Sequence, residues 1–169
     1  MKNLKSLLLI AIFSLGLINV TNAQKIAHIN TEKLVANMPE TKALKAEIEK
    51  LGKTYQGDIE GMAKKLEAKI KKYTAEQNTQ TQATNEKRAL EVQQDRAKIE
   101  QLRDVAYQEI QKKQQEKLGP ILKKAQQAIK DVAASRGVIY VLDSAAGKGL
   151  LVFDKGEDLY DAVKTKLGF

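Results

Sequence analysis

One apolar repeat dominates the middle of this chain. Residues 40–119 lie between the only two prolines, Pro39 and Pro120. Apolar side chains recur there in steps of four, three and four residues, and so repeat every eleven: Leu44, Ile48, Leu51, Tyr55, Ile59, Met62, Leu66, Ile70 and Tyr73. A period of eleven gives about 3.67 residues per turn, close to the natural pitch of an α-helix. The repeat therefore predicts a long, nearly straight helix whose narrow apolar stripe must be covered by a second helix.

The second helix is predicted to follow in the same chain. The stripe is lost over residues 78–85, which are polar and rich in Thr and Asn, so we expect the chain to reverse there. Thr81 or Thr84 is expected to cap the returning helix. The stripe then resumes at Val92, Ile99, Leu102, Ala106, Ile110, Ile121 and Val132. Because its phase is kept past Gly119-Pro120, we expect a kink at that point rather than the end of the helix.

The two helices are expected to form an arm over residues 39–119. The outgoing helix is predicted from about Pro39 to Asn78, and the returning helix from about Asn85. Three glycines oppose helix formation in the proximal half of the outgoing helix: Gly52, Gly57 and Gly61. Each costs about 1 kcal/mol relative to Ala. The helix is therefore predicted to be less stable in this part of the arm.

Short segments at both ends of the chain predict a small sheet. Residues 25–30 are expected to be a strand, and residues 137–142 and 150–153 a β-hairpin. Leu159, Val163 and Leu167 then line one face of a short final helix. The predicted fold is mainly α with a small β-body (α+β), in which a long antiparallel helical hairpin projects from the short strands. The body comprises residues 24–38 and 120–169.

The first residues have the layout of a secretory signal peptide, assigned to residues 1–23. Lys2 and Lys5 are basic, and residues 7–18 are almost entirely apolar. Cleavage is expected after Ala23. The alternative is an uncleaved membrane anchor, which the short apolar run disfavours. The chain has no cysteine, so an exported protein of this sequence is stabilised without disulfides.

The sequence gives no sign of enzyme chemistry. His28 is the only histidine, and there is no cysteine to share a metal ion with it, so a structural position in the first strand is expected. A catalytic triad is not available either, because the single histidine is expected to have this structural role. Gly147-Lys148-Gly149 lacks the first Gly and the Ser/Thr of a phosphate-binding loop and is predicted to be a turn. We therefore expect no enzymatic activity, no cofactor and no metal ion.

Three stretches together indicate a family. They are residues 25–34 with Met38-Pro39-Glu40, the hairpin rich in Lys, Gln and Glu, and residues 138–144 with Asp161-Ala162-Val163. Their order resembles that of the Skp/OmpH family of periplasmic chaperones of Gram-negative bacteria. The resemblance implies a periplasmic homotrimer, in which three hairpins extend like tentacles from a shared β-body. It further implies that unfolded outer-membrane proteins are held between the hairpins without ATP.

Basic residues near the tip of the arm are the candidate binding site: Lys64, Lys65, Lys69, Lys71, Lys72, Lys87 and Arg88. The functional interpretation is steering of acidic clients or anionic surfaces, which salt weakens. The alternative is an ordinary solvated helix face. Tyr55, Met62 and Tyr73 are expected to pack between the helices; exposed to a cavity, they would contact clients. Lipopolysaccharide or an anionic membrane surface is a further candidate partner, for which no residues are assigned.

Trimer formation is expected to bury apolar residues of the body: Ile26, Ile29, Val138, Ile139, Val141 and Val152. Unpaired edges of short strands favour such association. The preferred function is an ATP-independent holdase for unfolded outer-membrane β-barrel proteins. The alternative is a structural coiled-coil adaptor or spacer in the cell envelope. A third function, nucleic-acid binding, is permitted by the net charge of +8 but disfavoured by export and by the lack of an aromatic stacking surface.

Overall fold

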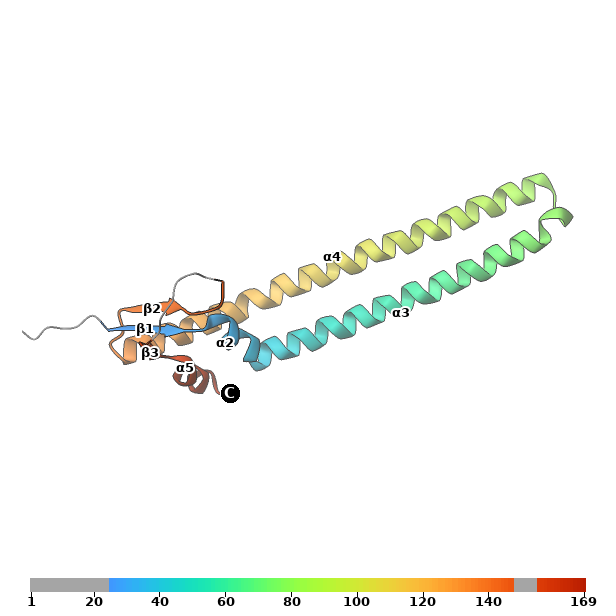
Figure 1. Cartoon of the computed structure of the whole chain (residues 1–169). Coiled ribbons are helices and arrows are strands. Elements are labelled where there is room, and N and C mark those ends of the chain that lie inside the picture. Colours follow the sequence, from blue (N-terminus) through green and yellow to red (C-terminus); the bar gives the residue numbers. More distant parts are fainter. Residues whose placement is uncertain (1–24, 148–154) are drawn as a thin grey trace, which may run out of the picture.

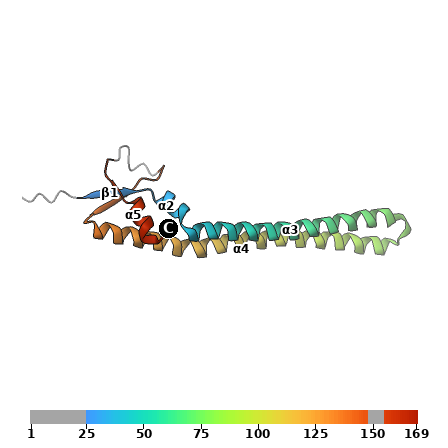
Figure 2. The same ribbon diagram turned by 90° about the horizontal axis from the view of Figure 1, so that it is seen from below.

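A long helical hairpin projects from a small body at one end of the molecule (Figures 1 and 2). The structure is a computed structural model that describes residues 25–147 and 155–169. Its elements in chain order are β1 (Ile26–Ile29), α2 (Thr31–Asn37), α3 (Pro39–Glu76), the 3₁₀ turn η1 (Gln77–Thr79), α4 (Gln82–Ser135), β2 (Tyr140–Asp143), β3 (Glu157–Asp158) and α5 (Tyr160–Leu167). The predicted fold class, mainly α with a small β-body, is confirmed.

The hairpin consists of α3 and the first part of α4, which run antiparallel. Every residue of the predicted stripe on α3 is buried or half-buried, and Ile99 and Ala106 are buried opposite it on α4. The predictions for Tyr55, Met62 and Tyr73 as residues between the helices are therefore confirmed. Figure 2 shows the two helices as one thin layer, which leaves most of the surface of each helix in contact with solvent.

Helix α3 begins at Pro39, where the missing N–H costs no hydrogen bond. The chain then reverses where the stripe is lost. At the tip, the backbone N–H of Thr84 donates to the hydroxyl of Thr81 over 3.2 Å, so Thr81 caps α4 and Thr84 does not. The returning helix begins at Gln82, three residues earlier than expected.

Helix α4 continues through Gly119 and Pro120 and ends only at Ser135, so the predicted continuation is confirmed. Beyond Pro120 its buried face belongs to the core of the body, through Ile121, Ala125, Ala128, Val132 and Ala133. The expected boundary between arm and body at residue 119 is thus a change of environment within one helix. One continuous helix therefore belongs to both the arm and the body.

The sheet is parallel, with strand order β2-β1-β3. Ile26 is paired with Tyr140 and Ile29 with Asp143, while His28 is opposite Asp158 in β3. The first strand of the predicted β-hairpin is present as β2, which runs parallel to β1. The second strand of that hairpin, residues 150–153, lies outside the described residues. Strand β3 escaped prediction because two acidic residues carry no β-propensity signal.

Hydrogen bonds join the sheet to the helices. The carboxylate of Asp143, at the end of β2, accepts from the backbone N–H of Thr31 over 3.2 Å and from its hydroxyl over 2.7 Å. It also accepts from the backbone N–H of Ala145 over 3.1 Å. His28 is buried in β1, and its Nε2 lies 3.2 Å from the carbonyl oxygen of Gly156. The structural role predicted for His28 is consistent with this position.

The glycines of α3 give a first prediction. No atom lies within 4 Å of the place that a Cβ would take at Gly52, Gly57 or Gly61. Replacing each by Ala should therefore raise the free energy of helix opening by up to about 1 kcal/mol, because Ala loses less backbone entropy. Hydrogen exchange of the α3 amides measures this change. Gly168→Ala, at the end of α5, is the control. It should lower the free energy of helix opening there, because Gly168 has φ +85° and a side chain at this position is strained. Faster exchange in Gly57→Ala would contradict the prediction.

Candidate functional site on the distal arm

Polar pairs connect the two helices along the distal arm, which we define as residues 62–102. Lys69 forms an ion pair with Asp95 across the helices. The Tyr73 hydroxyl donates to the Glu91 carboxylate over 2.6 Å, and this hydrogen bond raises the pKa of Tyr73. The side chains on the edge of the apolar stripe therefore fix how the two helices face each other.

Arg88 is the most enclosed of the predicted basic residues. Its Nη2 is 2.6 Å from the carboxylate of Glu76, and its guanidinium lies 4.5 Å from the centre of the Tyr73 ring. Its other terminal nitrogen, Nη1, is buried and has no hydrogen-bond partner among the described residues. Arg88 thus combines a structural contact across the tip with one nitrogen that makes no hydrogen bond to them.

The structure divides the predicted basic residues into two groups. Lys69 and Arg88 are half-buried in the cross-arm contacts just described. Lys71 is exposed and pairs with Glu67 on its own helix over 2.8 Å. The remaining four are exposed and form no ion pair with any described residue: Lys64, Lys65, Lys72 and Lys87. These four cations are the part of the predicted site that is available to a partner.

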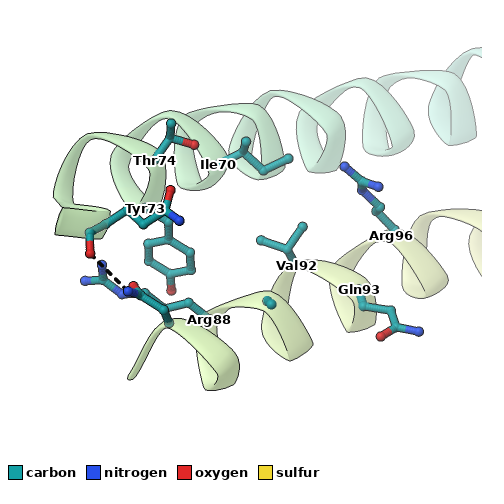
Figure 3. A pocket seen from close by; sticks show the side chains of 10 residues that line it. Ile70, Tyr73, Thr74, Arg88, Val92, Gln93 and Arg96 are labelled. Carbon is teal, nitrogen blue, oxygen red and sulfur yellow. Dashed lines mark hydrogen bonds between the residues drawn. The ribbon is translucent and has the colours of Figure 1, made fainter. Parts of the chain in front are cut away.

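A groove between the two helices also lies in the distal arm (Figure 3). This distal groove has a volume of about 490 Å³ and is lined by Ile70, Tyr73, Thr74, Gln77, Asn85, Arg88, Ala89, Val92, Gln93 and Arg96. Figure 3 shows side chains from both helices around it. Its lining contains two arginines and no carboxylate, so it favours an anionic group.

Sequence reasoning found the components of the groove but not the groove. The stripe predicted that Ile70, Tyr73 and Val92 lie between the helices, and the charge pattern singled out Arg88. The sequence analysis did not predict the register of α3 against α4. Cross-arm pairs such as Glu76 with Arg88 and Tyr73 with Glu91 reveal that register. A search for Tyr–Glu and Lys–Asp pairs at matched distances from the tip would have given it.

The apolar residues predicted for the trimer contact fall into two classes. Ile29 and Val138 are buried in the core of the single chain. They therefore have little surface left to bury in a contact between protomers. Ile26 and Ile139 are 48% and 54% exposed. Val141 is half-buried, and Val152 lies outside the described residues.

Among the described residues, no three His, Asp or Glu side chains gather in a group that is able to hold a metal ion. None of the described helices has the length and hydropathy required to cross a membrane.

Comparisons with known proteins agree with one another. A family model described as outer membrane protein (OmpH-like) matches residues 25–167. Chaperone protein Skp of Yersinia enterocolitica is 26% identical over 124 residues, which cover 73% of this chain and 76% of that protein. A solved structure of an OmpH-like protein from Caulobacter crescentus has a TM-score of 0.76 at 18% identity, and the match covers 84% of this chain and 82% of that one. This last likeness concerns the fold.

The cross-arm pairs predict that acid loosens the distal arm. Hydrogen bonding from Lys69 holds the pKa of Asp95 below its ordinary value. A carboxyl group with a lowered pKa in the folded state contributes stability above its unfolded pKa and loses it as pH falls through its folded pKa. Spin labels on cysteines introduced at Ala68 and Ala97 should therefore move apart below about pH 4 and keep their distance between pH 5 and 8.

Asp95→Asn is the control for this experiment. It removes the titrating group from the pair, so the labels should already be farther apart at pH 7 and should respond less to acid. An acid response equal to that of the parent chain would show that the Lys69–Asp95 pair does not hold the arm together.

Proposed function

The chain belongs to the family of OmpH-like outer membrane proteins, and from this premise we propose that it is a periplasmic chaperone that holds unfolded outer-membrane β-barrel proteins. It does so without ATP, by keeping aggregation-prone chains dispersed until they are released. The observation that carries the proposal is the shape of the arm. A hairpin one layer thick, with exposed cations near its tip, presents a large surface to a partner and buries little of it in its own fold.

The length of the arm suits a large, unfolded client. Helix α3 has 38 residues, which span about 57 Å at 1.5 Å per residue. Lys64, Lys65, Lys72 and Lys87 lie in the half of the arm farthest from the body. Each contact with a client is weak and screened by salt, but several arms that engage one chain hold it by multivalency. Weak contacts also allow release without an energy source.

Three protomers would supply several arms. The starts of β1 and β2 carry an exposed apolar cluster, in which Ile26 is paired with Tyr140, and Ile139 is adjacent in sequence. Tyr140 is 60% exposed. Among the described strands β2 lies at an edge of the sheet, and an edge strand favours pairing with another chain. We propose that this surface forms the contact between protomers in a homotrimer.

The structural adaptor remains the alternative function. It shares the long arm but requires one folded partner rather than many unfolded ones. Crosslinking in the periplasm separates the two: a single folded partner supports the adaptor, whereas a range of barrel precursors supports the chaperone.

The chaperone function predicts suppression of aggregation. One trimer per client should keep a urea-diluted β-barrel protein soluble, as measured by light scattering in the absence of ATP. Substituting Gln at Lys64, Lys65, Lys72 and Lys87 should weaken this activity at low salt, because four unpaired cations are lost. The control variant carries Gln at four exposed lysines near the body: Lys45, Lys50, Lys123 and Lys130. Equal losses in both variants would show that net charge alone matters, and no suppression by the parent chain would refute the function.

The trimer contact predicts a change of mass on substitution. Ile139→Lys should convert the trimer to monomer in multi-angle light scattering, because a charge is placed in a contact that excludes water. Leu90→Lys is the matched control, since Leu90 is 59% exposed but lies on the arm. A parent chain that is monomeric at micromolar concentration would refute the proposed trimer.

A further inference from the structure

The distal groove has the construction of a binding site. Its two walls come from α3 and α4, and the walls are held in register by the Tyr73–Glu91 hydrogen bond and the Arg88–Glu76 ion pair. Its volume of about 490 Å³ falls within the range of small-ligand pockets. Both walls belong to one chain. Binding here therefore does not depend on the cavity that several arms would enclose.

The charges of the groove select an anionic group. Arg96 contributes a guanidinium to the lining and forms no ion pair with any described residue. Arg88 contributes the buried Nη1, for which the described part of the chain provides no acceptor. Glu76 and Glu91, which hold the walls together, are not part of the lining. Because Glu76 already pairs with Arg88, Arg96 is the guanidinium of the lining whose charge no described carboxylate offsets.

The remaining lining residues distinguish a peptide from other anions. Thr74, Gln77 and Gln93 offer hydrogen-bond acceptors as well as donors. A peptide group uses both kinds, whereas a phosphate group offers only acceptors. Next to them, Ile70, Ala89 and Val92 form an apolar surface. The groove therefore matches a chain segment that brings a carboxylate, peptide groups and an apolar side chain together.

We propose that the distal groove binds short extended segments of unfolded clients in which an acidic residue lies close to an apolar one. The carboxylate is bound by Arg96, and the apolar side chain rests on Ile70 and Val92. In an extended chain, residues i and i+2 point to the same face, so Glu and Phe two positions apart enter the groove together. This inference rests on the proposed chaperone function and names the segments of a client that the arm recognises.

The test uses a labelled peptide and the full mature chain. The probe is a nine-residue Ser/Gly peptide with Glu two positions before Phe, followed by fluorescence anisotropy, and its partner peptide has Gln in place of Glu. The Glu peptide should bind at least threefold more tightly than the Gln peptide at low salt. Arg96→Gln should weaken binding of the Glu peptide about three- to tenfold, and Gln93→Ala should weaken it less.

Arg103→Gln is the matched control. Arg103 is also an exposed arginine of α4, but it pairs with Glu100 and lies outside the groove lining. It should change peptide binding less than 1.5-fold. Equal effects of Arg96→Gln and Arg103→Gln, equal binding of the two peptides, or no binding of either peptide would each overturn the proposal.

Two further measurements separate this proposal from binding that depends on the trimer and from binding of a lipid. The Ile139→Lys variant should bind the peptide as the parent chain does, because both walls of the groove lie in one protomer. The peptide assay therefore stands or falls independently of the aggregation assay. Phosphatidylglycerol vesicles should compete weakly with the peptide. Vesicles that displace it completely, with the same dependence on Arg96, would make the groove a lipid site and overturn the peptide proposal.

Discussion

The packing of one narrow apolar stripe against another is the interaction on which the rest of this molecule depends. The stripe on α3 contributes only one or two side chains per turn, so each level of the arm buries little apolar surface. Polar pairs on either side complete the contact: Glu40–Lys124 and Glu47–Lys113 near the body, Tyr55–Glu109 midway, and Lys69–Asp95 and Tyr73–Glu91 toward the tip. The eleven-residue period keeps the stripe straight, and the polar pairs set its register.

The body depends on the same helices. Helix α4 leaves the arm without interruption and packs Ile121, Ala125 and Val132 against the core that contains Ile29 and Leu34. The connection between the parallel strands β1 and β2 is the whole hairpin. The sheet therefore brings together segments that the whole arm separates in the sequence. Because α4 belongs to both parts, one continuous helix sets the direction in which the arm leaves the sheet.

A thin arm suits the proposed function for a physical reason. A thick core would bury the cations and apolar edges that a client can reach, whereas a two-helix layer leaves them exposed over its full length (Figure 2). The cost is a small buried area per residue and therefore a low stability of the arm. The glycines of α3 lower this stability still further. An arm with this balance binds many partners weakly and adjusts to them, and the distal groove adds one place where a defined chemical pattern is selected.

The sequence by itself determined the hairpin, its approximate ends, the stripe residues between its helices and the family. These follow from local periodicity, from Pro39 at a helix start and from Thr81 at a helix cap, all of which act over a few residues. Only the tertiary structure decided the parallel pairing of β1 with β2 and β3, the burial of Ile29 and Val138 within one chain, and the groove between Arg88 and Arg96. Each of these depends on which residues far apart in the chain become neighbours. That is set by the register of α3 against α4 and by the packing of both chain ends on α4, and a periodic pattern specifies neither.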